Sequence, residues 1–314
     1  MLDRIIGSTN DAASRLPEHA RMGVVHLRVR DIDVALSVWR DLIGLTLITR
    51  SGHTAALGAG SQTLIILEEG ARWPAPSQHL GLYHVAIRIP TREDFARAVA
   101  RIDAAHYRHS PTDHLVTATT YLSDPDGNGI ELMFETFDRG HLDVVDGQFR
   151  AFTKDGSLHS GREPLDLQTL FSSLDQDSDL TTALPAGTDI GHVHLHVTNL
   201  DRTMVFYTDV IGLKPRMKAT AFRMFDTALG SNPHAIAFNI WVGPDARLAP
   251  ADAAGLNHFT VDVRSTEALD QVAFRLRSSG HAVRRDGALL VTEDPSGNCL
   301  HLIAGDSHAM VFSI

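Results

Sequence analysis

A strand pattern followed by a helix pattern opens two distant segments of the chain. Residues 22–33 and 190–201 alternate apolar and polar side chains, as a half-buried strand does, and then reach a polar cap. Apolar residues at helical spacing follow in both segments and predict amphipathic helices over 34–40 and 202–207. The helices end in the related sequences Asp41-Leu-Ile-Gly-Leu45 and Asp209-Val-Ile-Gly-Leu213, whose glycines suit the left-handed position after a helix.

A second pair of similar segments begins with Gly81-Leu-Tyr-His84 and Gly255-Leu-Asn-His258. Each continues through a predicted helix, over 92–105 or 266–279, and closes with strands around an Asp-Pro-x-Gly turn. The two turns are Asp124-Pro-Asp-Gly-Asn-Gly-Ile-Glu131 and Asp294-Pro-Ser-Gly-Asn-Cys-Leu-His301. They place Glu131 and His301 at equivalent points on a strand, and both residue types bind metals. The chain therefore repeats one unit four times: a strand, a helix and about three strands.

The spacing of these units predicts the domain organisation. The units span 22–75, 80–137, 189–245 and 254–306, which predicts a first domain over 21–137 and a second over 189–306. Residues 138–188, rich in Asp, Gly and Ser, are expected to form a crossover or linker with one helix over 165–174. The first 20 residues are expected to form a loosely held tail.

Composition narrows the class of protein. With 43% apolar and 21% charged residues in 314, the chain is typical of a soluble globular protein, and no window reaches the roughly 18 apolar residues of a membrane span. The N-terminus lacks a signal-peptide pattern, and a net charge of -10 argues against nucleic acid as a main partner. The single cysteine, Cys299, excludes an internal disulfide and any cysteine-based metal site. A cytoplasmic location is expected.

The four units with their strand starts and Asp-Pro-x-Gly turns resemble the vicinal oxygen chelate superfamily of glyoxalase I, bleomycin-resistance proteins and extradiol ring-cleaving dioxygenases. The segments 81–84, 121–131, 190–197 and 239–243 are similar to those of two-domain catechol 2,3-dioxygenases. The resemblance implies an α+β fold, in which four βαβββ modules pair into two half-open mixed β barrels with helices outside. It also implies metal ligands on the first and last strands of a module.

Two ligand sets are open. His84, Glu131 and His192 would give two histidines and one glutamate, provided that the second and third modules share a barrel. His192, His258 and His301 would give three neutral ligands if the third and fourth modules pair. We favour the first set, because a carboxylate suits an Fe(II) site and because the second module alone carries the accessory residues His114 and Tyr121. Val24 occupies the ligand position of the first module, which contributes nothing there.

The resemblance implies catalytic roles for three further residues. His234 is the candidate that takes a proton from the substrate, and Tyr121 would donate a hydrogen bond to the bound oxygen. His114 would stabilise negative charge on activated oxygen and return a proton. Five other histidines lie in polar, loop-like contexts and are predicted to be solvent-exposed: His106, His109, His141, His159 and His281.

The resemblance implies that the protein is an extradiol dioxygenase, which inserts both atoms of O2 into a catechol-type diol at a non-haem Fe(II) site and yields a muconate semialdehyde. Mn(II) accepts the same ligands. The expected partners are therefore a small aromatic diol and O2, and a homo-oligomer is compatible with the sequence. Two alternatives share the fold: a glyoxalase-type metal-dependent isomerase or lyase, and a non-enzymatic small-molecule binding protein.

Overall fold

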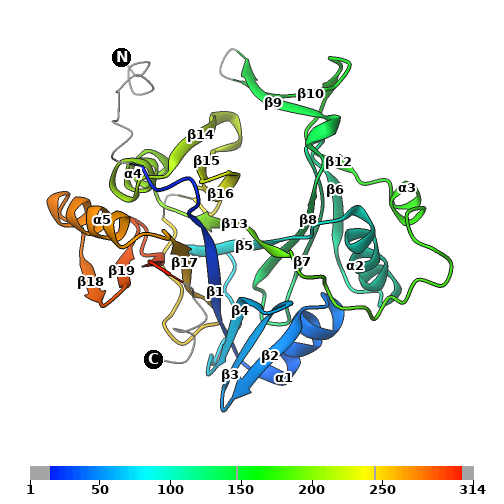
Figure 1. Ribbon diagram of the computed structural model, residues 1–314, viewed down its shortest axis with the longest axis horizontal. Helices are drawn as coiled ribbons and strands as arrows, with labels where there is room; N and C mark the ends of the chain where they lie inside the picture. The colour runs from blue at the N-terminus through cyan, green and yellow to red at the C-terminus, as the bar shows by residue number, and fades with distance from the viewer. Residues whose placement is uncertain (1–14, 146–147, 244, 306–314) are drawn as a thin grey trace.

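Two large mixed sheets, each built from two of the four repeated units, form the protein (Figure 1). The computed structural model describes residues 15–145, 148–243 and 245–305. Most of the predicted tail, residues 1–14, and residue 306 at the end of the fourth unit lie outside the described residues. Over the described residues neither sheet closes on itself, and the predicted α+β class with half-open sheets is confirmed.

The first sheet joins the first and fourth units. Its eight strands follow the order β18-β19-β20-β17-β1-β4-β3-β2, and β1 pairs antiparallel with β17 at its centre. The strands are β1 (Arg21–Val29), β2 (Thr46–Ser51), β3 (Thr54–Ala59), β4 (Gln62–Glu69), β17 (Gly255–Asp262), β18 (Val283–Asp286), β19 (Leu289–Glu293) and β20 (Cys299–Ile303).

The second sheet joins the second and third units. Its nine strands follow the order β12-β6-β7-β8-β5-β13-β16-β15-β14, with the antiparallel pair β5 and β13 at its centre. The strands are β5 (Gly81–Arg88), β6 (Ser110–Asp113), β7 (Thr117–Ser123), β8 (Gly129–Glu135), β12 (Glu163–Pro164), β13 (Asp189–His196), β14 (Lys214–Ala219), β15 (Met224–Leu229) and β16 (Asn232–Asn239). The second and third units, which precede and follow the linker, therefore share this sheet. The boundaries assigned to the two domains stay a prediction.

One helix per unit packs on the outside of the sheets, as predicted (Figure 1). Each helix starts at a side chain that accepts a hydrogen bond from the first turn, namely Asp31, Thr91, Asn199 and Ser265. The helices are α1 (Ile32–Leu36), α2 (Arg92–Ala104), α4 (Leu200–Val205) and α5 (Thr266–Ser278); α1 and α4 continue as the π-helical turns η3 (Ser37–Leu42) and η5 (Phe206–Ile211).

The glycines after the two π-helical turns behave as the sequence predicts. Gly44 and Gly212 have φ of 94° and 104°, the left-handed backbone that ends these helices. Large side chains of the turns, Trp39 and Tyr207, are fully buried against the sheets. Each ring also reaches an Asp-Pro-x-Gly turn, which ties the helix of one unit to a strand end of its neighbour.

The linker holds more structure than its composition predicts. Its helix is present but short, α3 (Leu167–Phe171). Before it lie a turn of 3-10 helix, η4 (Phe137–Arg139), and a three-stranded sheet, β9 (Gly140–Val145), β10 (Gln148–Thr153) and β11 (Leu158–His159). The two-residue strand β12 then joins the second sheet at β6, so the linker is attached to the edge of that sheet. In the third unit, a further 3-10 turn, η6 (Thr220–Phe222), contacts β10.

None of the helices in the described part of the chain has the length and apolar character needed to cross a membrane.

Candidate metal centre and active site

Two imidazoles and one carboxylate meet at the centre of the second sheet. His84 on β5, Glu131 on β8 and His192 on β13 are each no more than 5% exposed. The His84 Nε2 atom lies 2.9 Å from His192 Nε2 and 3.1 Å from Glu131 Oε2, and His192 Nε2 lies 3.2 Å from the same oxygen. Within the described residues these three form the one cluster of potential metal ligands.

Strand register explains why the three side chains converge. The strand β5 lies between β8 and β13, and Ala86 on β5 is opposite both Glu131 and His192. The small Gly129 allows β8 to approach β5 closely, because a Cβ there would lie 1.9 Å from the carbonyl oxygen of Tyr83. The sheet therefore brings together residues more than 100 positions apart in sequence.

The turn before β8 is fixed by one buried carboxylate. Asp124 accepts hydrogen bonds from the backbone N–H groups of Asp126 and Asn128, from the side-chain amide of Asn128 and from the indole N–H of Trp39. Burial raises the pKa of Asp124, and these donors stabilise its charged form. The Asp-Pro-x-Gly motif is thus a structural device that sets where β8 begins, and with it the position of Glu131.

The electrostatics of the cluster favour an ionised carboxylate beside neutral imidazoles. Burial opposes ionisation of Glu131, but the contacts with His192 and His84 outweigh it and hold the pKa of Glu131 well below its usual range. Burial lowers the pKa of His192 to about 3, and a proton on His234 would add to this effect. Neutral imidazole and ionised carboxylate are the protonation states that bind metals.

The donor set fits a divalent ion. The Nδ1 atoms of His84 and His192 are buried without a hydrogen-bond partner, so nothing in the described protein fixes the tautomer of either ring. With Nδ1 protonated, the two Nε2 lone pairs and the Glu131 charge point at one another, and a cation between them would remove the repulsion. Ligand atoms about 2.1 Å from an ion and at right angles lie about 3.0 Å apart, close to the observed spacing and typical of one face of an octahedron.

The predicted partners His114 and Tyr121 lie beside the cluster and contact each other. Tyr121 on β7 is opposite Glu131 on β8, and its ring centroid lies 5.5 Å from that of His84. The His114 Nδ1 atom lies 2.6 Å from the carbonyl oxygen of Gly161, which can only accept, so this nitrogen carries a proton. Tyr121 then donates its hydroxyl proton to His114 Nε2 over 2.9 Å. Burial, reinforced by the charge of Glu131, raises the pKa of Tyr121 well above its usual value.

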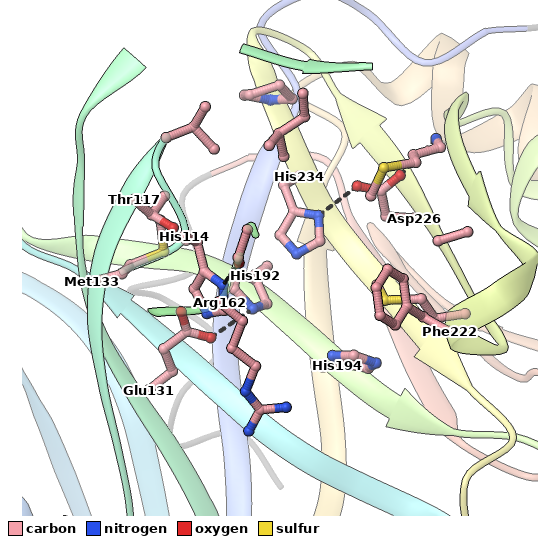
Figure 2. Close-up of a pocket in the computed structure, with 18 of the residues that line it drawn as sticks. His114, Thr117, Glu131, Met133, Arg162, His192, His194, Phe222, Asp226 and His234 are labelled. Carbon is pink, nitrogen blue, oxygen red and sulfur yellow. Dashed lines mark hydrogen bonds and ion pairs between the residues drawn. The ribbon is translucent and has the colours of Figure 1, made fainter. Parts of the chain in front are cut away.

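The third predicted residue, His234, lies on the opposite side of the cluster (Figure 2). Its ring centroid is 4.3 Å from that of His192, and its Nδ1 atom lies 2.7 Å from Asp226 Oδ2. Asp226 is fully buried and also receives a hydrogen bond from Arg216. His234 and Arg216 outweigh the burial of Asp226 and lower its pKa, so the carboxylate accepts and the Nδ1 atom of His234 donates.

Comparison with known proteins assigns the family. The family model described as the Glyoxalase/Bleomycin resistance protein/Dioxygenase superfamily matches residues 21–132 and 189–302. The chain belongs to this superfamily. It is 31% identical over 285 residues to a catechol-2,3-dioxygenase of Bacillus subtilis strain 168, which covers 88% of this chain and 95% of the relative. It is 30% identical over 106 residues to the glutathione transferase FosA of Serratia marcescens, covering 34% of this chain and 74% of FosA.

Solved structures of the superfamily support the fold. A candidate dioxygenase from Bacillus subtilis has a TM-score of 0.59 at 12% identity, covering 90% of this chain and 85% of its own. Glyoxalase I of Zea mays has a TM-score of 0.53 at 16% identity, covering 91% and 92%. At these identities the likeness concerns the arrangement of the chain and not its chemistry.

The cavity of this superfamily member includes residues that the sequence analysis did not assign. It has a volume of about 380 Å³ and is lined by the three potential ligands His84, Glu131 and His192. Tyr83, His194 and Trp241 also line it. Tyr83 and His194 have ring centroids 5.1 Å apart, and Tyr83 and Trp241 are also 5.1 Å apart. His194 follows His192 by two positions, and the strand period already indicates that both point to one face. Arg162 from the linker also lines the cavity, and no sequence motif marks it.

The alternative set of three histidines is not formed among the described residues. His258 and His301 lie in the first sheet and stack on each other with ring centroids 3.6 Å apart, whereas His192 lies in the second sheet. Burial lowers the pKa of His258 to about 2 and that of His301 to about 4.

Of the five histidines predicted to be exposed, His106 and His141 are exposed, whereas His109, His159 and His281 are partly buried. The side chains of His109 and His159 are each 9% exposed. His109 contacts the Thr120 hydroxyl at 2.9 Å, and His159 accepts a hydrogen bond from the Gly161 N–H. Polar sequence surroundings do not reveal such partners, which lie on a neighbouring strand or in the same turn.

Proposed function

We propose that this protein is an extradiol ring-cleaving dioxygenase that inserts both atoms of O2 into a catechol-type aromatic diol at a non-haem Fe(II) site. The observation that carries the proposal is the convergence of two imidazoles and one carboxylate, all buried, on one face of a cavity. The extent of the similarity to a catechol-2,3-dioxygenase, 95% of the relative's length, supports it. The product would be a ring-opened muconate semialdehyde.

In this proposal His84, Glu131 and His192 hold the ion. These three residues would leave part of the ion's coordination sphere open to the substrate and O2. Fe(II) held there would supply Lewis acidity toward the diol and electron exchange between the aromatic ring and O2. Mn(II) accepts the same ligand set, so the choice of metal is part of the proposal.

His234 takes the proton of one diol hydroxyl. Because its Nδ1–H donates to Asp226, the Nε2 atom of the neutral ring carries a free lone pair. Figure 2 shows that this side of the ring faces the cavity and that the other side faces Asp226. The buried carboxylate stabilises the imidazolium that forms, so His234 is suited to be the general base.

Tyr121 and His114 would hydrogen-bond to the substrate and to O2 and transfer protons to them. Because its pKa is raised, Tyr121 keeps its proton at neutral pH. In the free protein that single proton is donated to His114, and it would turn to a substrate oxygen when the diol binds. His114 has Nε2 directed at the Tyr121 hydroxyl, so a proton can pass between the two without solvent. The carbonyl of Gly161 keeps the His114 ring oriented throughout.

Aromatic side chains would exclude water and hold the diol ring. Phe149 on β10 contacts Phe222 at a centroid distance of 5.6 Å, and both line the cavity. Tyr83 and Trp241 provide a second aromatic surface near the cluster. An apolar lining favours a flat aromatic substrate over a small polar one.

Oxygen consumption tests the proposal directly. Protein purified under argon and supplied with Fe(II) should consume one O2 per catechol cleaved and form a yellow product. A glyoxalase-type isomerase or lyase, the alternative suggested by the FosA relative and sharing the same ligands, would act without O2. Turnover of a glyoxalase or glutathione-transfer substrate under argon, with no O2 uptake in the presence of catechol, would overturn the dioxygenase assignment.

A further inference from the structure

One charged side chain in the cavity has no opposite charge beside it. Five charged residues line the cavity: Glu131, Glu135, Arg162, Arg216 and Asp226. Glu135 pairs with Arg88 at 2.9 Å, and Arg216 pairs with Asp226 at 2.9 Å. Glu131 belongs to the metal cluster. Over the described part of the chain, no carboxylate lies within ion-pair distance of Arg162.

The main chain at Arg162 is held rigidly, even though its side chain is exposed. The preceding residue, Gly161, has φ of 75°, and its carbonyl oxygen accepts the 2.6 Å hydrogen bond from His114. The Gly161 N–H donates to His159 Nδ1, and the N–H of Arg162 donates to the hydroxyl of Ser160. The next residue, Glu163, lies on strand β12, which pairs antiparallel with β6 and places Glu163 opposite Asp113 in the second sheet.

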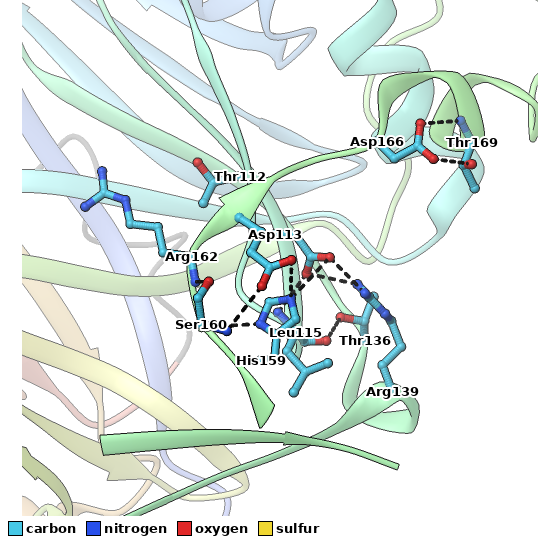
Figure 3. Close-up of polar contacts among 12 residues, drawn as sticks. Thr112, Asp113, Leu115, Thr136, Arg139, His159, Ser160, Arg162, Asp166 and Thr169 are labelled. Atoms are coloured by element: carbon cyan, nitrogen blue, oxygen red, sulfur yellow. Dashed lines mark hydrogen bonds and ion pairs between the residues drawn. The ribbon is translucent and has the colours of Figure 1, made fainter. Parts of the chain in front are cut away.

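A network of charged side chains holds the turn at residues 160–162 in place (Figure 3). Asp113 receives two hydrogen bonds from Arg139, at 2.9 and 2.8 Å. His159 Nε2 lies 3.4 Å from Glu163 and 3.9 Å from Asp113. In Figure 3 the side chain of Arg162 points away from this network, and Arg162 lines the cavity that Glu131 and His192 also line. The turn therefore presents one guanidinium to the cavity without using it in the fold.

The charge of Arg162 acts inside the cavity. Arg162 lines this cavity together with Tyr83 and Glu131. With a divalent ion bound to Glu131, the net charge of the cavity would be positive, in a chain whose total charge is -10. Such a local positive field attracts anionic ligands.

We propose that Arg162 selects aromatic diols that carry a carboxylate substituent, by pairing with that carboxylate at the mouth of the cavity. The inference rests on the proposed dioxygenase function and names its substrate class. A planar guanidinium matches a carboxylate through two parallel hydrogen bonds, whereas a neutral ring substituent gives it no partner. The volume of about 380 Å³ lies within the range of roughly 300–1,000 Å³ typical of ligand pockets, so it has room for a substituted ring.

Matched pairs of substrates test the proposal. The substrates are 3,4-dihydroxybenzoate and 3-(3,4-dihydroxyphenyl)propanoate, each compared with its own neutral amide, in the Fe(II)-loaded enzyme. Wild type should have a kcat/KM for at least one acid roughly tenfold to hundredfold above that for its amide. Arg162→Gln should remove this preference by lowering kcat/KM for the acid far more than for its amide, and Arg162→Lys should restore part of it. Arg108→Gln, which removes an exposed arginine outside the cavity, should keep the preference.

A binding measurement without turnover separates this inference from the proposed function. Under argon, calorimetry of the Mn(II)-loaded protein should show that Arg162→Gln weakens binding of the preferred acid and not of its amide. Turnover of the amides and the acids with equal kcat/KM in wild type would overturn the role of Arg162 and leave the dioxygenase intact. An equal loss for acid and amide in Arg162→Gln would also overturn selection, because it would assign the arginine to the diol. If none of the four compounds causes O2 consumption, the proposed function itself is overturned.

Discussion

Replacing Glu131 by Gln tests the metal centre through stability alone. The amide has the shape of the carboxylate but no charge, and Oε2 of Glu131 lies 3.1 and 3.2 Å from the two Nε2 atoms. Without metal, the variant should unfold within about 1 kcal/mol of wild type, because a neutral amide at this buried site can still hydrogen-bond to an imidazole. The two proteins should differ only when metal is added.

The expected size of that difference follows from mass action. Metal at 100 times its Kd adds about 2.7 kcal/mol to the stability of the folded state. For a chain of this size, 1 kcal/mol corresponds to about 2 °C in Tm, so wild type should gain about 5 °C. Changing residues that only support ligands weakens metal binding by roughly 10–100-fold, so loss of the one charged ligand should cost at least about 100-fold. At the same metal concentration the gain then falls to about 0.4 kcal/mol, or about 1 °C.

Calorimetric melts with and without Mn(II) under argon measure this shift. The matched control is Glu135→Gln, because Glu135 lies on the same strand and lines the same cavity but pairs with Arg88. It should keep the full metal-induced shift. If Glu131→Gln also keeps the full shift, then Glu131 is not a ligand and the assignment of the centre is wrong.

Three further predictions concern the neighbouring histidines and tyrosine. Tyr121→Phe should lower kcat roughly 100-fold, as loss of one preorganised donor does, while the metal content measured by atomic emission stays the same; unchanged kcat would exclude Tyr121 from catalysis. The double replacement of His258 and His301 by Ala should leave both metal content and turnover largely intact, and loss of metal would instead place ligands in the first sheet. The pKa of His258 is lowered to about 2 from an ordinary value near 6.5, so the unfolded chain binds the extra proton and stability falls as pH drops below about 6.5. Between pH 6 and 4, urea melts of metal-free wild type should lose about 1.4 kcal/mol per pH unit more than those of His258→Ala, and equal slopes would contradict the buried neutral state.

The repeated units and their helices could be predicted from sequence because their signals are local. The helices predicted over 92–105 and 266–279 agree to within one residue with α2 and α5, since each has a capping side chain and a regular apolar face. The linker was harder, because β9, β10 and β11 pair only with one another and carry no hydrophobic alternation strong enough to stand out from a polar segment. Arg162 could not be identified from the sequence, because its position depends on a hydrogen bond to Ser160 and on the pairing of strand β12 with the second sheet.

The ligand residues could be named from sequence, but their meeting could not be derived from it. Each unit offers an edge strand, and nothing local in β5 distinguishes β13 from the other first strands as its partner. The choice depends on how whole units pack across the linker. The favoured set of His84, Glu131 and His192 rested on the chemistry of a carboxylate ligand and on the accessory residues of the second unit, and the second sheet brings the three together.

Comparison of the two sheets explains why the described residues form one such cluster and not two. In both sheets a histidine of one central strand is opposite a histidine of the other, His84 with His194 and His26 with His258. The turn is also retained, because Asp294 receives hydrogen bonds from Asn298 and Tyr207 as Asp124 does from Asn128 and Trp39. What differs is the side chains at the ligand positions: Val24, packed with Ala56 and Ile66, replaces the third ligand, and His301 replaces the carboxylate. Because no carboxylate is present at this position, His258 and His301 stack on each other. The same strand arrangement therefore brings potential metal ligands together in the second sheet and packs two imidazole rings in the first.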